Sequence, residues 1–191
     1  MRQAEFSRET LETRITGSLT LEGGEIRVKT GIGFFDHMLT AFARHGGFGL
    51  VLTAAGDLEV DGHHTVEDTG IVLGTLLRAA LGDKSGIARY GSFFVPMDEA
   101  LGFAAADISG RAYLVWDAAF LESRAGDFDL CLAEEFWRAF CMNAGITLHL
   151  RLLYGKNGHH GCEAIFKAAG HALRQAVTPV QGGVLSTKGV L

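Results

Sequence analysis

Two short motifs contain the histidines that are best placed to do chemistry. Residues 61–67 read D-G-H-H-T-V-E, and residues 157–163 read N-G-H-H-G-C-E. The two doublets hold half of the 8 histidines in the chain, and each is followed at the same spacing by a glutamate. Imidazole and carboxylate groups together bind Mn(II), Fe(II) or Zn(II). A lone doublet would be typical of a surface or capping pair, but the repeated pattern His-His-x-x-Glu indicates a metal site.

Helical geometry predicts where these side chains point. Residues four apart share one face of a helix, so the first histidine of each doublet can converge with its glutamate. The second histidine lies about 100° further round the helix and cannot easily bind the same ion. The motifs therefore predict two metal ions, each bound by more than one segment, and octahedral Mn(II) suits this many ligands better than tetrahedral zinc. The candidate ligands of the two motifs are His63, His64, Glu67, His159, His160 and Glu163.

The similarity extends beyond the doublets into an internal repeat. Residues 63–81 align with residues 159–177, and several aligned positions hold the same residue type. These positions are Gly74 with Gly170, Leu77 with Leu173, Arg78 with Arg174 and Ala80 with Ala176. The segment before each doublet aligns more faintly and places His37 opposite Glu135. His37 is thus a further candidate ligand, and Glu135 is its counterpart in the second half.

The repeat divides the chain into two halves, each predicted to form strand, strand, helix, strand and helix. The predicted strands are residues 13–21, 25–30, 48–53, 101–108, 112–116 and 146–153, and the predicted helices begin near residues 36, 63, 134 and 159. A Ser-Gly-Arg segment between two of the strands predicts a hairpin. We expect an α+β fold built by tandem duplication of a half-domain, with two helices on one face of an antiparallel sheet. The single domain would span 1–191, with pseudo-repeats at about 1–92 and 93–191.

Composition excludes several classes of protein. A chain of 191 residues with 48% hydrophobic and 20% charged residues is typical of a soluble globular domain. The net charge of −5, without a cluster of Lys or Arg, argues against nucleic acid as a partner. There is no apolar run of the roughly 18 residues that a membrane span needs, and the N-terminus lacks the apolar core of a signal peptide. The 3 cysteines form no C-x-x-C pair, so a reduced, cytoplasmic setting is expected.

Four segments together resemble the imidazoleglycerol-phosphate dehydratase family. They read T-G-I-G-F-F-D-H-M-L (30–39), D-G-H-H-T-V-E-D (61–68), G-K-N-G-H-H-G-C-E-A-I-F-K-A (155–168) and S-T-K-G-V-L (186–191). The resemblance spans the whole chain, and the length is similar to that of the monofunctional form, which lacks a fused phosphatase. It implies a hydro-lyase of histidine biosynthesis that removes water from imidazole glycerol phosphate to give imidazole acetol phosphate.

The resemblance also implies a fold, a cofactor and an assembly. The fold would be of the ribosomal protein S5 domain 2-like type, and the subunits would form a homo-oligomeric 24-mer with two Mn(II) ions per active site at subunit contacts. Both doublets, with their glutamates, match family ligands, as does His37. Where many members have His-Phe-Phe, this chain has Glu-Phe-Trp, so the remaining ligand is open between Glu135 and His149. His149 lies opposite Val51 in a strand, where a buried, hydrogen-bonded histidine is expected.

Further residues match the substrate-binding and catalytic positions of the family. The phosphate-binding matches are Arg89, Arg111, Ser186 and Lys188, and the catalytic matches are Glu12, Glu163 and Lys167. Arginine offers two parallel donors to a phosphate, and serine and lysine add more. Leu185 stands where members usually have proline, which would loosen the terminal loop. Asp98 and Glu99 are further candidates for proton transfer, with turn or capping roles as the alternative.

The substrate limits the mechanism, because no carbonyl group acidifies its C2 proton. Deprotonation of the metal-bound imidazole would instead expel the C3 hydroxyl and give a diazafulvene. Loss of the C2 proton would then give an enol that ketonises, with carboxylate and amine groups moving the protons.

Two rival functions would also use clustered histidines and carboxylates. A dinuclear metallohydrolase would usually carry more aspartate ligands at strand ends, and a metal-storage protein would not need Arg89, Arg111 and the Ser-Thr-Lys tail.

Overall fold

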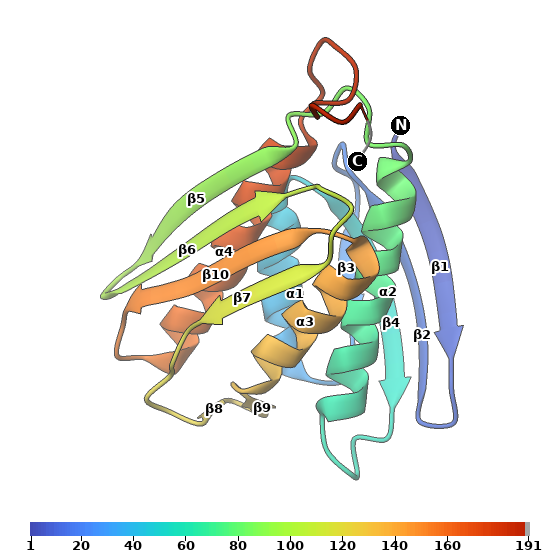
Figure 1. Cartoon of the computed structure of the whole chain (residues 1–191). Coiled ribbons are helices and arrows are strands. Elements are labelled where there is room, and N and C mark those ends of the chain that lie inside the picture. Colours follow the sequence, from blue (N-terminus) through green and yellow to red (C-terminus); the bar gives the residue numbers. More distant parts are fainter. Residues whose placement is uncertain (190–191) are drawn as a thin grey trace.

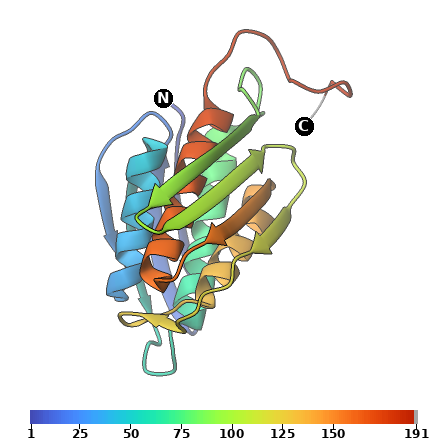
Figure 2. The same cartoon turned by 90° about the vertical axis from the view of Figure 1, so that its left-hand side faces the viewer.

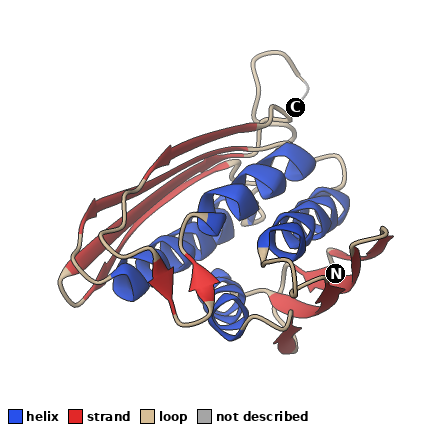
Figure 3. Cartoon of the chain, turned by 90° about the horizontal axis from the view of Figure 1, so that it is seen from below, coloured by secondary structure: helices blue, strands red, loops and turns tan. Residues whose placement is uncertain are grey.

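A computed structural model describes residues 1–189, which form two four-stranded sheets, a two-stranded ribbon and four helices. The first half contains β1 (Gln3–Glu9), β2 (Thr13–Thr20), β3 (Ile26–Lys29), α1 (Gly33–Gly46), β4 (Gly49–Gly56) and α2 (His63–Leu81). The second half contains β5 (Tyr90–Met97), β6 (Ala100–Asp107), β7 (Tyr113–Asp117), β8 (Arg124–Ala125), β9 (Phe128–Asp129), α3 (Leu132–Ala144), β10 (Thr147–Tyr154) and α4 (Gly158–Val177). The helices lie between the two sheets (Figure 3).

The two sheets have the same topology, with orders β1-β2-β4-β3 and β5-β6-β10-β7. The predicted α+β class and the two similar halves are therefore confirmed, with the helices of each half on one face of its sheet (Figure 1). The division at about residue 92 remains a proposal, and β5 begins just before it at Tyr90. None of the helices within residues 1–189 is long and apolar enough to cross a membrane.

The hairpin predicted across Ser-Gly-Arg was wrong. β10 lies between β6 and β7, antiparallel to the first and parallel to the second. The reason is that β7, α3 and β10 form a strand-helix-strand unit with parallel strands, which leaves only the far edge of β10 for β6. The first half repeats this arrangement, because β4 lies between β2 and β3.

Each four-stranded sheet also contains one strand more than the sequence predicted, and the short ribbon of β8 and β9 was not predicted either. β1 has no buried residue on either face, so it lacks the alternation by which strands are recognised. β5 contains a glycine and a proline, which weaken a strand prediction. It pairs with β6 along its whole length.

The helices of the two halves pack against each other in the pairs α1 with α4 and α2 with α3. Glycines that the repeat aligns lie at these contacts. A Cβ atom at Gly74 would lie 2.4 Å from the backbone oxygen of Phe140 in α3, and one at Gly170 would lie 2.6 Å from that of Phe42 in α1. Only glycine permits so close a backbone approach. The close contact of α1 with α4 is what positions the candidate site.

An aromatic cluster fills the centre of the helix layers. Phe136 and Trp137 of α3 are fully buried, and their rings lie 4.8 Å apart. Burial of each such side chain stabilises the fold by about 1.5–3 kcal/mol. The segment Glu-Phe-Trp therefore begins at the surface and continues directly into the core.

Candidate active site

Both histidine doublets lie in the first turn of a helix, where the backbone N–H groups still need acceptors. Asp61 Oδ1 accepts the N–H of His63 at 2.7 Å at the start of α2. Asn157 is the N-cap of α4, and its Oδ1 accepts the N–H of His160 at 3.2 Å. These two polar residues end the preceding loops and orient the first turns that carry the doublets.

The contact between α1 and α4 brings His37, His159 and Glu163 together. Glu163 Oε2 lies 3.1 Å from His159 Nε2 and 3.4 Å from His37 Nε2. Their three ligand atoms all lie within 4.8 Å of one another. Glu163 is only 5% exposed, whereas both histidines are open to solvent. Two imidazoles and a carboxylate at this spacing suit a divalent metal ion that is reached from the solvent side.

Lys167 lies one turn beyond Glu163 on α4 and controls its charge. Lys167 Nζ donates to Glu163 Oε1 at 2.8 Å. Burial opposes ionisation of Glu163, but the hydrogen bond and the charge of Lys167, with help from His37, outweigh it and lower the pKa of the carboxyl group. Glu163 is therefore ionised and has one oxygen toward the histidines and one toward the lysine.

The first doublet lacks an equivalent group of three within residues 1–189. His63 Nε2 lies 3.8 Å from Glu67 Oε2 on the same face of α2, as the helical spacing predicts. Glu135 lies on α3, the helix that packs on α2, but its carboxylate lies 3.9 Å from Arg138 Nε. Within residues 1–189, His63 and Glu67 therefore lie near each other, whereas Glu135 pairs with Arg138 of the same helix.

The expectation that His149 is buried and hydrogen-bonded was wrong. Leu148 and Leu150 of β10 are fully buried against the helices. Because side chains alternate along a strand, His149 points to the opposite face of the sheet and is exposed. It is not part of the group formed by His37, His159 and Glu163.

The second histidine of the first doublet points away from its neighbour, as predicted. The rings of His63 and His64 are 86° apart in orientation. His64 Nδ1 lies 3.0 Å from Asp57 Oδ2, and its Nε2 lies 3.8 Å from Glu12 Oε1. The hydrogen bond with Asp57 raises the pKa of His64. Asp57 was not among the predicted site residues, and its only signal in the sequence was an acidic residue directly after a strand and near a doublet.

The second doublet has a similar arrangement. His160 Nδ1 lies 2.8 Å from Glu99 Oε2, and its Nε2 lies 3.9 Å from Asp98 Oδ2. Glu99 also accepts the backbone N–H groups of Lys156 and Asn157. The hydrogen bond from His160, followed by that from Asn157, lowers the pKa of Glu99 to about 2. Glu99 thus links the β5–β6 turn to the first turn of α4.

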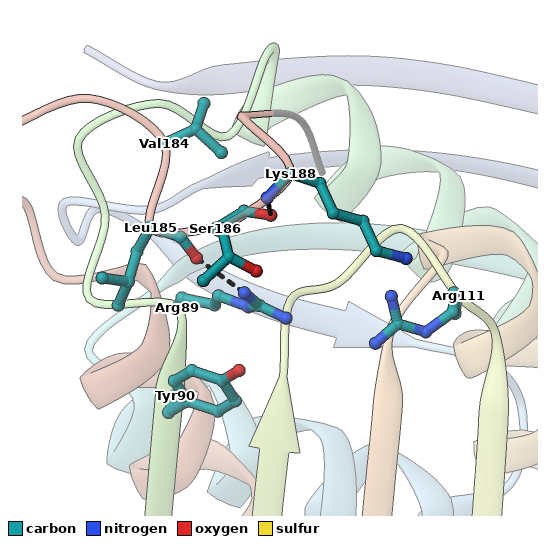
Figure 4. A pocket seen from close by; sticks show the side chains of 8 residues that line it. Arg89, Tyr90, Arg111, Val184, Leu185, Ser186 and Lys188 are labelled. Atoms are coloured by element: carbon teal, nitrogen blue, oxygen red, sulfur yellow. Dashed lines mark hydrogen bonds between the residues drawn. The ribbon is translucent and has the colours of Figure 1, made fainter.

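A separate pocket of about 830 Å³ contains the predicted phosphate-binding residues (Figure 4). They are Arg89, Arg111, Ser186 and Lys188. The C-terminal segment reaches this pocket after α4 by running past the end of the second sheet (Figure 2). Despite the leucine in place of proline, the carbonyl of Leu185 accepts from Arg89 Nη1 at 2.6 Å, which holds the segment against the sheet.

The pocket has an excess of positive charge. Asp107 is the one acidic partner of its arginines that the structure describes, with Oδ1 2.7 Å from Arg89 Nε and Oδ2 3.7 Å from Arg111 Nη2. Lys188 and Arg111 point into the same space (Figure 4). Two guanidinium groups and an ammonium around one carboxylate leave a net positive site that suits a phosphate group.

The fold and this site define a class of duplicated α+β proteins with a histidine–carboxylate centre and a cationic pocket. A family model of imidazoleglycerol-phosphate dehydratase matches residues 30–173. Imidazoleglycerol-phosphate dehydratases of Streptococcus mutans and Bacillus thuringiensis are each 59% identical to this chain over 194 aligned residues, with 100% of both chains covered. The chain therefore belongs to the imidazoleglycerol-phosphate dehydratase family. It is a hydro-lyase of histidine biosynthesis.

Solved structures agree with this assignment. The imidazoleglycerol-phosphate dehydratase of Staphylococcus aureus is 41% identical and has a TM-score of 0.85, covering 93% of this chain and 99% of its own. The Pyrococcus furiosus enzyme, solved in complex with (S)-C348, is 39% identical and has a TM-score of 0.86, covering 97% of this chain and 100% of its own.

Proposed function

We propose that the chain dehydrates D-erythro-imidazole glycerol phosphate to imidazole acetol phosphate at a centre that holds two Mn(II) ions. The observation that carries this proposal is that His37, His159 and Glu163 converge from two helices. Their ligand atoms all lie within 4.8 Å of one another. Nitrogen and carboxylate donors without a thiolate suit Mn(II). When bound, the ions would supply Lewis acidity toward the imidazole ring of the substrate and a template for its orientation.

The ligand set is proposed from both halves. His37, His159 and Glu163 would hold one ion, and His63 and Glu67, with Glu135, would hold the other. Glu135 is half-buried and would have to leave its ion pair with Arg138 to serve as a ligand. The remaining ligands would be His64 and His160.

Substrate orientation is assigned to the cationic pocket. Arg89 is held by Asp107 and by the carbonyl of Leu185, so its guanidinium is preorganised. Arg111 is more exposed and free to close on a phosphate group. Ser186 and Lys188 would complete the phosphate site with a hydroxyl group and an ammonium group.

Proton transfer is assigned to Lys167, Glu12 and Glu163, and Glu163 would act both as a metal ligand and as a base. Lys167 carries an ammonium group beside Glu163, where it can donate a proton to the departing hydroxyl. Glu12 lies beside His64 in the β1–β2 turn and is largely exposed, so its carboxylate can accept a proton from the substrate. The reaction would pass through a diazafulvene, because this explains how the non-acidic C2 proton of the substrate becomes removable.

Assembly and location form part of the same proposal. We infer a 24-mer with active sites at subunit contacts, since His64 and His160 lie outside the group of His37, His159 and Glu163 and remain available to another copy. The single domain would consist of two repeats, at about 1–92 and 93–191. A cytoplasmic setting is supported by the three cysteines, which all lie in the described chain and are free.

One assay tests the function. Mn(II)-loaded protein is incubated with imidazole glycerol phosphate, and the products are separated by mass. We expect a product lighter by one water molecule. Release of inorganic phosphate would instead identify a metallohydrolase, and an unchanged substrate would favour a metal-storage protein.

A further inference from the structure

The second histidine of each doublet contacts a carboxylate from outside its own motif. His64 Nδ1 lies 3.0 Å from Asp57 Oδ2, and His160 Nδ1 lies 2.8 Å from Glu99 Oε2. In both cases a carboxylate meets the same ring nitrogen. The ring of each second histidine is thereby held at a steep angle to that of the first, 86° in one doublet and 80° in the other.

The two carboxylates come from different places in the repeat. Asp57 directly follows β4, whereas Glu99 lies in the turn between β5 and β6. The duplicated backbone therefore does not explain why both contacts exist. A carboxylate thus contacts the same atom of both rings although it is supplied by a different segment in each half.

The contact decides which ring nitrogen is free. An ionised carboxylate only accepts hydrogen bonds, so Nδ1 of each histidine must carry the proton. The neutral ring then has its lone pair on Nε2, which is the form that binds a metal ion. Histidines that bind metals usually donate the other ring N–H to a carboxylate or carbonyl in this manner.

Backbone hydrogen bonds hold the main chain of Asp57 and the carboxylate of Glu99 in place. The N–H of Asp57 donates to the carbonyl of Glu12 at 3.2 Å, which fixes the residue against the β1–β2 turn. Glu99 Oε1 accepts the N–H of Asn157 at 2.8 Å and that of Lys156 at 3.2 Å. The backbone of Asp57 and the carboxylate of Glu99 are thus anchored independently of the histidine that each residue contacts.

The free nitrogens point to other acidic groups. His64 Nε2 lies 3.8 Å from Glu12, and His160 Nε2 lies 3.9 Å from Asp98. Neither ring belongs to the group of three ligands that the described chain brings together. The Nε2 atoms of His64 and His160 therefore have a fixed orientation but are not ligand atoms of that group.

We propose that Asp57 and Glu99 are positioning residues of the metal centres, which hold His64 and His160 in the Nδ1–H form with Nε2 ready to bind an ion. This inference rests on the proposed function, in which both histidines are metal ligands. Asp57 serves one of the two ions and Glu99 serves the other.

Metal titration of the full chain tests the proposal. Free Mn(II) is measured by electron paramagnetic resonance while the ion is added to metal-free protein. We expect two classes of site in the unaltered chain. Asp57→Ala should weaken one class about 10–100-fold and leave the other unchanged, and Glu99→Ala should weaken the opposite class.

Two further variants separate positioning from folding. Asp57→Asn keeps an oxygen that accepts from Nδ1–H, so its affinity should lie between those of the unaltered chain and Asp57→Ala. Glu59→Ala removes one negative charge from the same loop, and its side chain makes no hydrogen bond in the described structure, so it should leave both classes unchanged. Thermal unfolding of the metal-free variants shows whether each is folded.

The outcomes are distinct. If the unaltered chain binds no Mn(II), the proposed function itself fails. If it binds Mn(II) in two classes but folded Asp57→Ala and Glu99→Ala bind both with unchanged affinity, the positioning roles are refuted. Equal weakening of both classes by either variant would also refute them, because it would indicate a general structural effect.

Discussion

Replacement of Lys167 by alanine separates the chemistry of α4 from its metal binding. Lys167 Nζ lies 2.8 Å from Glu163 Oε1, and only 18% and 7% of the two side chains are exposed. A hydrogen bond between charged groups contributes about 1.5–3 kcal/mol. Because some solvent reaches the lysine, we expect metal-free Lys167→Ala to lose an amount near the lower end of that range. In a chain of this size, each kcal/mol lowers the melting temperature by about 2–4 °C.

The effect on activity should be much larger than the effect on stability. Lys167 is not a proposed ligand, so the Mn(II) content should stay intact, and a bound ion would neutralise Glu163 in place of the lost ammonium. Turnover of imidazole glycerol phosphate should nevertheless fall by about 10²–10⁴-fold, the usual contribution of a positioned proton donor. The assay is steady-state product formation, with metal content measured on the same sample.

Lys29→Ala is the matched control, because Lys29 is an exposed lysine on β3. It should change neither turnover nor melting temperature. Near-normal turnover in metal-replete Lys167→Ala would remove Lys167 from the mechanism. An unchanged melting temperature in the metal-free variant would show that the ion pair with Glu163 does not contribute to stability.

Other consequences of the structure can be tested in the same way. Arg111→Ala should raise KM about 10-fold or more through loss of a charge-assisted contact to phosphate, with unfolding in urea unchanged; an unchanged KM would place the phosphate elsewhere. Glu67→Gln should lower the Mn(II) content and the assembly size seen by ultracentrifugation, and a metal-replete, fully assembled variant would contradict its role. Gly170→Ala forces a Cβ atom to within 2.6 Å of a backbone oxygen of α1, so it should destabilise the chain by about 1–3 kcal/mol in urea unfolding; native stability would refute the close packing of α1 on α4. His45 Nδ1 lies 3.1 Å from His171 Nε2. Burial, followed by neighbouring positive charge, lowers the pKa of both histidines. As the pH falls, the unfolded chain takes up these protons before the folded chain does. The free energy of unfolding of the metal-free chain should therefore have its full value above about pH 6.5 and decrease as the pH drops below it. His171→Gln should reduce that decrease, and an identical pH profile would refute the explanation.

Local patterns in the sequence were sufficient for much of the fold. The spacing of apolar residues predicted both doublet-bearing helices, and the repeated His-His-x-x-Glu predicted two similar halves. The strands β1 and β5 escaped prediction because β1 buries neither face and β5 is interrupted by glycine and proline. The order of strands also could not be read locally. A hairpin between β6 and β7 suited the turn residues, but pairing of β10 with both strands satisfies more backbone groups than the hairpin alone.

The candidate site divides in the same manner. Helical spacing was sufficient to predict that His63 lies near Glu67, that His159 lies near Glu163, and that the second histidine of each doublet points elsewhere, because these relations exist within one turn of one helix. The tertiary structure decided that His37 joins Glu163 and that His149 is exposed. It also brought Asp57 and Glu99 to the doublets. These contacts depend on how helices and strands distant in sequence approach each other, and that approach is set by close backbone packing at positions such as Gly74 and Gly170, which no local pattern encodes.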